Sequence, residues 1–172
     1  MHTNQPATYR LPRAAVAALV LAGAVSIGVL VHQAIRVEHE NPSTANLDPE
    51  LRGALREAAV DAAADGVELV VNSGWRSAAE QERLLRAAVS KYGSATEAAR
   101  WVATPATSAH VSGEAADIGA AGAAWLSEHG ARYGLCQIYT NEPWHFEFRP
   151  EAGEHGCPPR YADPTQDPRM WQ

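Results

Sequence analysis

The feature that most limits how this chain can fold is an uninterrupted apolar run near its N-terminus. Residues 14–31 read AAVAALVLAGAVSIGVLV, in which Ser26 is the only polar side chain. As a helix rising ~1.5 Å per residue, this run spans about 27 Å, close to the thickness of a bilayer core. A buried core helix is the alternative, but such helices rarely lack a polar stripe over several turns. We therefore expect residues 14–31 to be a membrane segment.

The charges beside this run predict its orientation. Residues 1–13 contain two arginines and no acid, whereas residues 36–46 contain two glutamates and one arginine. Because basic residues favour the cytoplasmic side, residues 1–13 should be cytoplasmic and the rest of the chain extracytoplasmic. We expect a retained single-pass anchor in the cell membrane. The small residues 22–24 also offer a cleavage site, which would give a secreted protein instead. Residues 32–46 are polar and aperiodic, as in a linker.

The charge balance and the two cysteines narrow the possible functions. The net charge is −6, and residues beyond 36 carry all 20 acidic groups. A duplex-binding surface needs clustered Lys and Arg, so nucleic acid is not an expected partner, and nothing points to an obligate protein partner. Cys136 and Cys157 form no CxxC pair. Outside the cell they can form a disulfide, and two buried free thiols are the alternative.

Capping and turn signals predict the elements of a domain over residues 47–160, followed by an irregular tail over residues 161–172. Helices are expected from Asp48 to Gly66, over 77–92 up to Gly93, from Ser94 to before Pro105, and over 123–130 with Gly130 as terminator. Strands are expected over 67–72, 115–119, 134–140 and 144–149. From Pro150 onward the chain should be an irregular wrap or a frayed end. This order predicts an α+β fold with helices packed on one face of a small antiparallel sheet.

Two of the seven histidines stand out because of their neighbours. His110 lies seven residues before Asp117 in SAHVSGEAAD, and His145 begins the last strong strand. Two histidines and an aspartate supply three ligands and leave one tetrahedral position for water, as in a catalytic zinc site. Glu142, three residues before His145, is then the natural general base. A His near an Asp is common in any domain, and a glutamate in a turn is often only solvated. These residues alone therefore do not establish a catalytic zinc site.

A third segment strengthens the pattern. Residues 73–77 read SGWRS, between an expected strand and the next expected helix, and they precede SAHVSGEAAD and EPWH in the chain. In this order and spacing the segments resemble the vancomycin-resistance D,D-carboxypeptidases of the VanY type and their D,D-dipeptidase relatives, which are zinc peptidases with the fold of the hedgehog signalling domain. The pattern SxHxxGxAxD is filled by Ser108, His110, Gly113, Ala115 and Asp117, and ExWH is filled by Glu142, Trp144 and His145.

The resemblance implies roles for the matching residues. It implies one zinc ion per chain, with His110, Asp117 and His145 as its ligands and Glu142 as the catalytic base and acid. It also implies that Arg76 stabilises the oxyanion of the tetrahedral intermediate, and an ordinary surface ion pair is the alternative.

Two further residues match positions that line the substrate site in relatives. These are Ser108 and Gln81, which lies five residues after Arg76. A plain solvent-exposed glutamine is the alternative for Gln81.

The resemblance therefore implies a membrane-anchored, zinc-dependent D,D-carboxypeptidase. Its expected substrates are peptidoglycan precursor peptides that end in D-Ala-D-Ala, with a role in glycopeptide resistance or cell-wall remodelling. D,D-dipeptidase activity on free D-Ala-D-Ala is the second hypothesis. A non-catalytic zinc or cell-wall binding module is the third, although such a module would need neither Glu142 nor Arg76.

Overall fold

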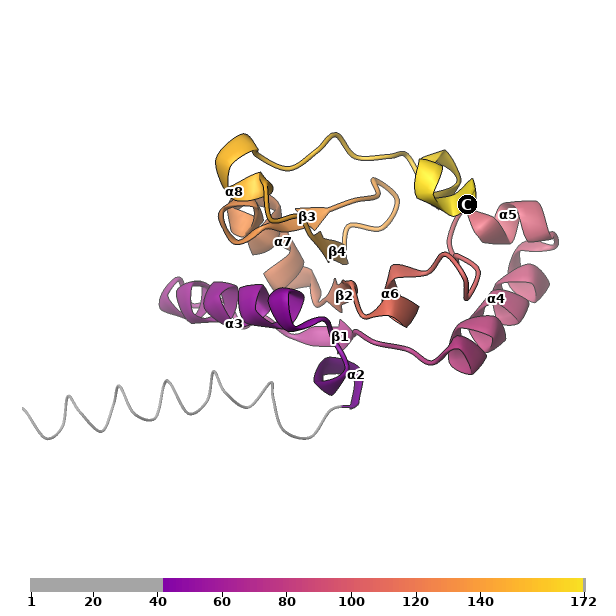
Figure 1. Ribbon diagram of the computed structural model, residues 1–172, viewed down its shortest axis with the longest axis horizontal. Coiled ribbons are helices and arrows are strands. Elements are labelled where there is room, and N and C mark those ends of the chain that lie inside the picture. The colour runs from indigo at the N-terminus through magenta and orange to yellow at the C-terminus, as the bar shows by residue number, and fades with distance from the viewer. Residues whose placement is uncertain (1–41, 172) are drawn as a thin grey trace, which may run out of the picture. The chain divides into compact units, whose positions relative to one another are not determined.

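The computed structural model describes residues 42–171 (Figure 1). The predicted membrane segment 14–31, its possible cleavage site and most of the linker lie outside the described residues. Across residues 42–171 the helices are all too short or too polar to span a membrane.

The described part of the chain contains helices, 3-10 helices and four short strands. The helices are α2 (Pro42–Ala45), α3 (Pro49–Ala64), α4 (Ala78–Tyr92), α5 (Ala95–Ala99), α6 (Ala109–Ser112), α7 (Ala120–His129) and α8 (Ala152–His155), and the 3-10 helices are η2 (Gly130–Tyr133), η3 (Pro164–Gln166) and η4 (Pro168–Trp171). The strands are β1 (Val71–Ser73), β2 (Ala115–Ile118), β3 (Leu135–Gln137) and β4 (His145–Phe148). The strands form one sheet in the order β1-β2-β4-β3, and every pairing is antiparallel. The predicted α+β class and antiparallel sheet are confirmed.

The two faces of the sheet have different environments because side chains alternate along a strand. Ala116, Ile118 and Phe146 point into the main core, where α3 and α7 pack against the sheet. Asp117 and His145, which are directly opposite each other on β2 and β4, occupy the other face. Hydrophobic residues therefore hold the sheet from one side and leave polar residues on the other side for a site.

The expected packing of all helices on one face is correct only for α3 and α7. Helices α4 and α5 contact each other, and both lie apart from the main core. In Figure 1 they occupy the end of the domain opposite α3 and α7. Residues of α4 line a cleft shared with Asp117 and His145. Helix α4 is amphipathic, and its apolar side faces this cleft instead of the sheet.

The capping signals set the N-terminal ends of α3, α4 and α5 as predicted. The side chain of Asp48 accepts hydrogen bonds from Glu50 N and Leu51 N, and Pro49 occupies the first turn of α3. Ser77 and Ser94 cap α4 and α5 in the same way. Each cap satisfies backbone donors that the helix itself leaves unpaired.

Several predicted elements differ in extent from the structure. The helix expected from Ser94 to before Pro105 ends at Ala99, and the strand expected over 134–140 covers only Leu135–Gln137. The strand expected over 67–72 pairs only from Val71 to Ser73. Gly130 follows the last residue of α7, as predicted, but its φ is −63° and not left-handed; the chain continues as η2 until Gly134, whose φ is +73°. A side chain at Gly130 would overlap the carbonyl oxygen of Leu135. Position 130 therefore requires a glycine because the backbone of Leu135 approaches it closely. Gly134 is the residue that adopts the left-handed conformation.

The C-terminal part of the chain is an ordered wrap, so the predicted alternative of a frayed end is wrong. Cys136 and Cys157 form a disulfide, which confirms the predicted bridge. Tyr161 then makes backbone hydrogen bonds to Ile138 and Thr140. Figure 1 shows the chain running on from α8 to a C-terminus beside α5.

Candidate metal centre

Three side chains from three elements meet on the polar face of the sheet. His110 comes from α6, Asp117 from β2 and His145 from β4. His110 Nε2 lies 3.2 Å from both His145 Nδ1 and Asp117 Oδ1, and His145 Nδ1 lies 3.3 Å from Asp117 Oδ1. The structure therefore brings together the three residues predicted as ligands, in a nearly equilateral triangle of donor atoms.

The triangle has the dimensions of a zinc site. Zinc bonds of ~2.0–2.1 Å to nitrogen or oxygen in a tetrahedron place neighbouring donor atoms about 3.3–3.4 Å apart. The three donor atoms form a group that could hold a metal ion, and two of the residues are buried. The residues present thus fit zinc in both donor chemistry and spacing, with the fourth position open.

Each histidine ring is oriented by a second hydrogen bond. His110 Nδ1 donates to the carbonyl oxygen of Gly74 at 2.7 Å, which leaves the Nε2 lone pair directed at the triangle. His145 Nε2 lies 3.2 Å from Glu147 Oε1. Partners of this kind hold a ligating imidazole in the required orientation. Gly74, from the SGWRS segment, packs closely against the backbone of Ser43, whose carbonyl oxygen a Cβ at position 74 would meet at 2.5 Å.

The buried charges around the triangle shift the pKa values of its members. Burial lowers the pKa of His110, which favours its neutral form. Burial alone would raise the pKa of Asp117, but hydrogen bonds from both histidines hold it well below its usual range. Burial also disfavours a charged His145, yet hydrogen bonds to Asp117 and Glu147 more than offset this and raise its pKa to about 9. The raised pKa favours a protonated His145, which lies between Asp117 and Glu147.

Arg76 lies directly beside the triangle. Its Nη2 donates to Asp117 Oδ2 at 2.5 Å, its Nε to Ser73 Oγ at 3.0 Å, and its Nη1 to Gln81 Oε1 at 3.4 Å. The guanidinium is mostly buried. The alternative of an ordinary surface ion pair is wrong, because the partner of Arg76 is a carboxylate of the candidate metal centre.

Gln81 and Ser108 are both buried and both line the cleft. Gln81 is only 2% exposed, and its Nε2 donates to the carbonyl oxygen of Ala103 at 2.9 Å. The alternative of a plain surface glutamine is therefore wrong. Their predicted contact with substrate stays a prediction.

Glu142 lies in the turn before β4, as the sequence predicts. Its side chain is mostly buried, and its Oε2 lies 3.9 Å from His145 Nδ1. Burial raises the pKa of Glu142 to about 7, although the positive charge of the nearby His145 partly lowers it. A carboxyl group with a pKa near neutrality can both accept and return a proton at physiological pH.

A cleft of about 630 Å³ opens over the triangle. One wall is apolar and includes Leu84 and Ala88 of α4, together with Tyr92 and Trp101, whose rings stack 5.7 Å apart. Trp144 also lines the cleft and is 42% exposed. The cleft has the size and the mix of walls typical of sites for small molecules or peptide ends.

Sequence reasoning missed the charged residues behind His145. Glu147 follows His145 by two positions on β4, so strand alternation places both on one face and could have indicated it. From the C-terminal segment, Arg169 donates to Glu147, and Asp167 accepts from Arg169. No local pattern in that proline-rich segment could have indicated either residue.

The chain is similar to a known protein family over the region that contains this site. Residues 44–151 match the family model VanY, described as D-alanyl-D-alanine carboxypeptidase. A D-alanyl-D-alanine carboxypeptidase of Enterococcus faecalis is 31% identical over 153 residues, covering 66% of this chain. The chain spans 57% of the length of that relative.

Solved structures of similar proteins share the fold. VanYB in complex with D-alanine-D-alanine has a TM-score of 0.58 and 31% identity, covering 66% of this chain and 77% of that chain. A variant of the vancomycin resistance D,D-pentapeptidase VanY in complex with Zn(II) has a TM-score of 0.56 and 30% identity, covering 65% and 78%. The L,D-carboxypeptidase DacB of Streptococcus pneumoniae has a TM-score of 0.53 and 26% identity, covering 67% and 73%. The match over the whole candidate centre shows that this chain belongs to the VanY family of D-alanyl-D-alanine carboxypeptidases.

Proposed function

We propose that this protein is a zinc-dependent D,D-carboxypeptidase that hydrolyses the terminal D-Ala-D-Ala bond of peptidoglycan stem pentapeptides. The observation that carries the proposal is the triangle of His110, Asp117 and His145 at the base of an open cleft, with Glu142 beside it. Family membership and the relative solved with D-alanine-D-alanine support the substrate class. The relative solved with Zn(II) supports the metal.

The proposed chemistry divides between the metal and two side chains. A zinc ion held by the triangle would lower the pKa of its water and polarise the scissile carbonyl. Glu142 takes the proton from the attacking water and then returns it to the departing D-alanine amine. Its raised pKa, about 7, suits both steps.

Arg76 supplies positive charge to the same reaction. Its Nη2 holds Asp117 in place, whereas its Nη1 makes only a 3.4 Å contact to Gln81. We propose that Nη1, which is held less tightly than Nη2, stabilises the developing oxyanion. Ser108 and Gln81, on the cleft wall, hold the substrate.

In the decisive experiment, the purified full chain is incubated with zinc and with each of three substrates. A pentapeptide ending in L-Lys-D-Ala-D-Ala should release D-alanine, and EDTA should stop the reaction. Penicillin should not inhibit, because neither Ser73 nor Ser108 has the SxxK spacing of serine D,D-peptidases. Faster cleavage of free D-Ala-D-Ala would favour a D,D-dipeptidase. Release of D-alanine only from a tetrapeptide ending in L-Lys-D-Ala would favour L,D-carboxypeptidase activity, the activity given for DacB.

A protein that is folded and loaded with zinc but cleaves none of the three substrates would contradict the proposal. The result would favour a non-catalytic zinc or cell-wall binding module instead. A role in glycopeptide resistance is tested separately, by measuring vancomycin susceptibility of cells that express the wild-type chain or a Glu142→Gln variant.

We also propose that residues 14–31 anchor the protein in the cell membrane with the domain outside. The Cys136–Cys157 disulfide supports this location, since such bridges persist in oxidising compartments. Protease added to intact spheroplasts should digest the domain, and detergent should be needed to extract the protein from membranes. Protection from protease in intact spheroplasts would contradict the orientation.

A further inference from the structure

Glu147 is a buried carboxylate in contact with a predicted metal ligand. It is 0% exposed, and its Oε1 lies 3.2 Å from His145 Nε2. A charge buried in this way is stable only if cations and hydrogen-bond donors surround it. The residues that hold Glu147 therefore also determine how firmly His145 is oriented.

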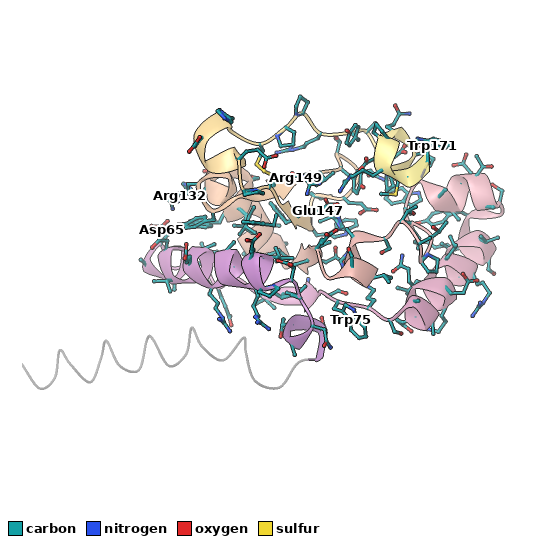
Figure 2. The ribbon with its side chains drawn as sticks, in the orientation of Figure 1. Asp65, Trp75, Arg132, Glu147, Arg149 and Trp171 are labelled. Carbon is teal, nitrogen blue, oxygen red and sulfur yellow. A yellow bond between two sulfur atoms is a disulfide. The ribbon has the colours of Figure 1, made fainter. Side chains whose placement is uncertain are left out.

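Two arginines hold this carboxylate. Arg149, close in sequence, donates from Nη2 to Oε2. Arg169 reaches both oxygens, with Nη1 2.6 Å from Oε2 and Nη2 3.2 Å from Oε1. Oε1 is the oxygen that faces His145, so Arg169 is the side chain whose contact orients it. Figure 2 labels Glu147 and Arg149, which lie near each other at the end of β4.

Arg169 is itself fixed from behind by Asp167. This carboxylate is 0% exposed and receives Arg169 Nε at 3.0 Å and Nη2 at 2.5 Å. Asp167 also accepts a hydrogen bond from the Tyr139 hydroxyl at 2.9 Å. The result is a chain of alternating charge that runs from Asp167 through Arg169 and Glu147 to His145, and both of its carboxylates are buried.

The segment that carries Arg169 is attached along its length. We call residues 161–171 the C-terminal strap. Its backbone pairs with the end of the β3 segment, with Thr140 N donating to Tyr161 O at 2.8 Å and Asn141 N to Ala162 O at 3.2 Å. Asp163 of the strap receives Arg100 Nε at 3.0 Å.

The strap also forms part of the cleft. Pro164 and Met170 line the same cleft as the candidate metal centre. The family match ends at residue 151, so the strap lies beyond the region that this chain shares with the family model.

We infer that the C-terminal strap is part of the active site, and that Arg169 is a positioning residue that orients His145 for metal binding through Glu147. The inference rests on the proposed metal centre and extends it to a segment outside the matched region. With the guanidinium removed, Oε1 keeps no charged donor from residues 42–171 apart from the imidazole, and His145 loses a fixed partner.

The test measures the zinc dissociation constant of the metal-free full chain by competition with a chromophoric chelator. Loss of an outer partner of a metal ligand typically weakens metal affinity by about 10- to 100-fold. Arg169→Gln should therefore raise the dissociation constant by roughly that factor. Arg160→Gln is the matched control, since Arg160 is an exposed arginine just before the strap, and it should leave the constant unchanged.

A double-variant cycle separates positioning from a general structural role. Glu147→Gln should weaken zinc binding, and adding Arg169→Gln should then weaken it by no more than about threefold further. Arg169→Lys, which keeps the charge but not the two-oxygen contact, should weaken binding by about fivefold or more, and it serves as the test if Arg169→Gln does not fold.

The outcomes are distinct. Wild-type zinc affinity in Arg169→Gln, or in Arg169→Lys if only that variant folds, would overturn the inference, even if thermal stability fell. Fully additive effects of Glu147→Gln and Arg169→Gln would also overturn it. A wild-type protein that binds no zinc would instead overturn the proposed metal centre.

Discussion

Loss of the Cys136–Cys157 disulfide should lower the free energy of unfolding of the domain by about 3 kcal/mol. The two cysteines are 21 residues apart in the sequence, and cross-linking a loop of this length removes roughly 3 kcal/mol of unfolded-chain entropy. The loop contains Glu142 and His145, so its unfolding removes the catalytic end of the site. For a domain of this size, a loss of about 3 kcal/mol corresponds to a decrease in Tm of roughly 10 °C.

The assay is urea unfolding of the metal-free protein, followed by tryptophan fluorescence with and without a strong reductant. The matched control is the Cys136→Ala/Cys157→Ala double variant, which should unfold like the reduced wild type and should not respond to reductant. Because Cys136 is fully buried, the double variant can lose up to about 1 kcal/mol more from the missing sulfur.

A loss of less than about 1 kcal/mol on reduction would refute the reasoning. That result would mean that the hairpin of β3 and β4 already constrains the unfolded chain, so that the bridge removes little further entropy.

Further predictions concern the metal and the proton transfers. Elemental analysis of the wild type should find one zinc per chain, and His110→Ala and His145→Ala should abolish it, because two protein ligands are too few to hold the ion. Glu142→Gln should keep zinc but lower kcat by about 10²- to 10⁴-fold, since the amide cannot transfer the proton; a loss under tenfold in a pentapeptide assay would contradict its role. Arg76→Lys should lower kcat/KM without loss of zinc, because a point charge cannot contact two groups at once. In the metal-free protein the pKa of His145 is raised to about 9, so zinc must displace its proton. Zinc affinity should therefore rise about tenfold per pH unit from pH 7 to 9 and level off above 9, and a pH-independent affinity over this range would contradict the charge balance.

Local features of the fold could be predicted from the sequence because they depend on near neighbours in the chain. A cap such as Asp48 or Ser77 binds backbone groups only two or three residues away. The polar face of the sheet follows from alternation along β2 and β4. The strand signals in the sequence predict that Asp117 and His145 lie on strands.

The candidate ligands could be predicted for a different reason. The spacing from His110 to Asp117 and the EPWH segment carry a family pattern, and the structure brings these residues into one triangle. The environment of Arg76 could not be predicted in this way. Its contact with Asp117 joins residues 41 positions apart, and no periodicity in the sequence indicates it.

Only the tertiary structure decided which distant segments meet. Helix α4 is amphipathic whichever apolar surface it covers, so its sequence could not show that it lines a cleft and not the sheet. Asp167 and Arg169 lie in a proline-rich segment without periodicity, yet Asp167 is fully buried and Arg169 joins it to Glu147 on the metal-site side of the sheet. Helix caps and strand alternation arise from interactions over a few residues, which the sequence displays directly. The pairing of buried charges depends on which segments the folded core brings together, and that information is spread over the whole chain.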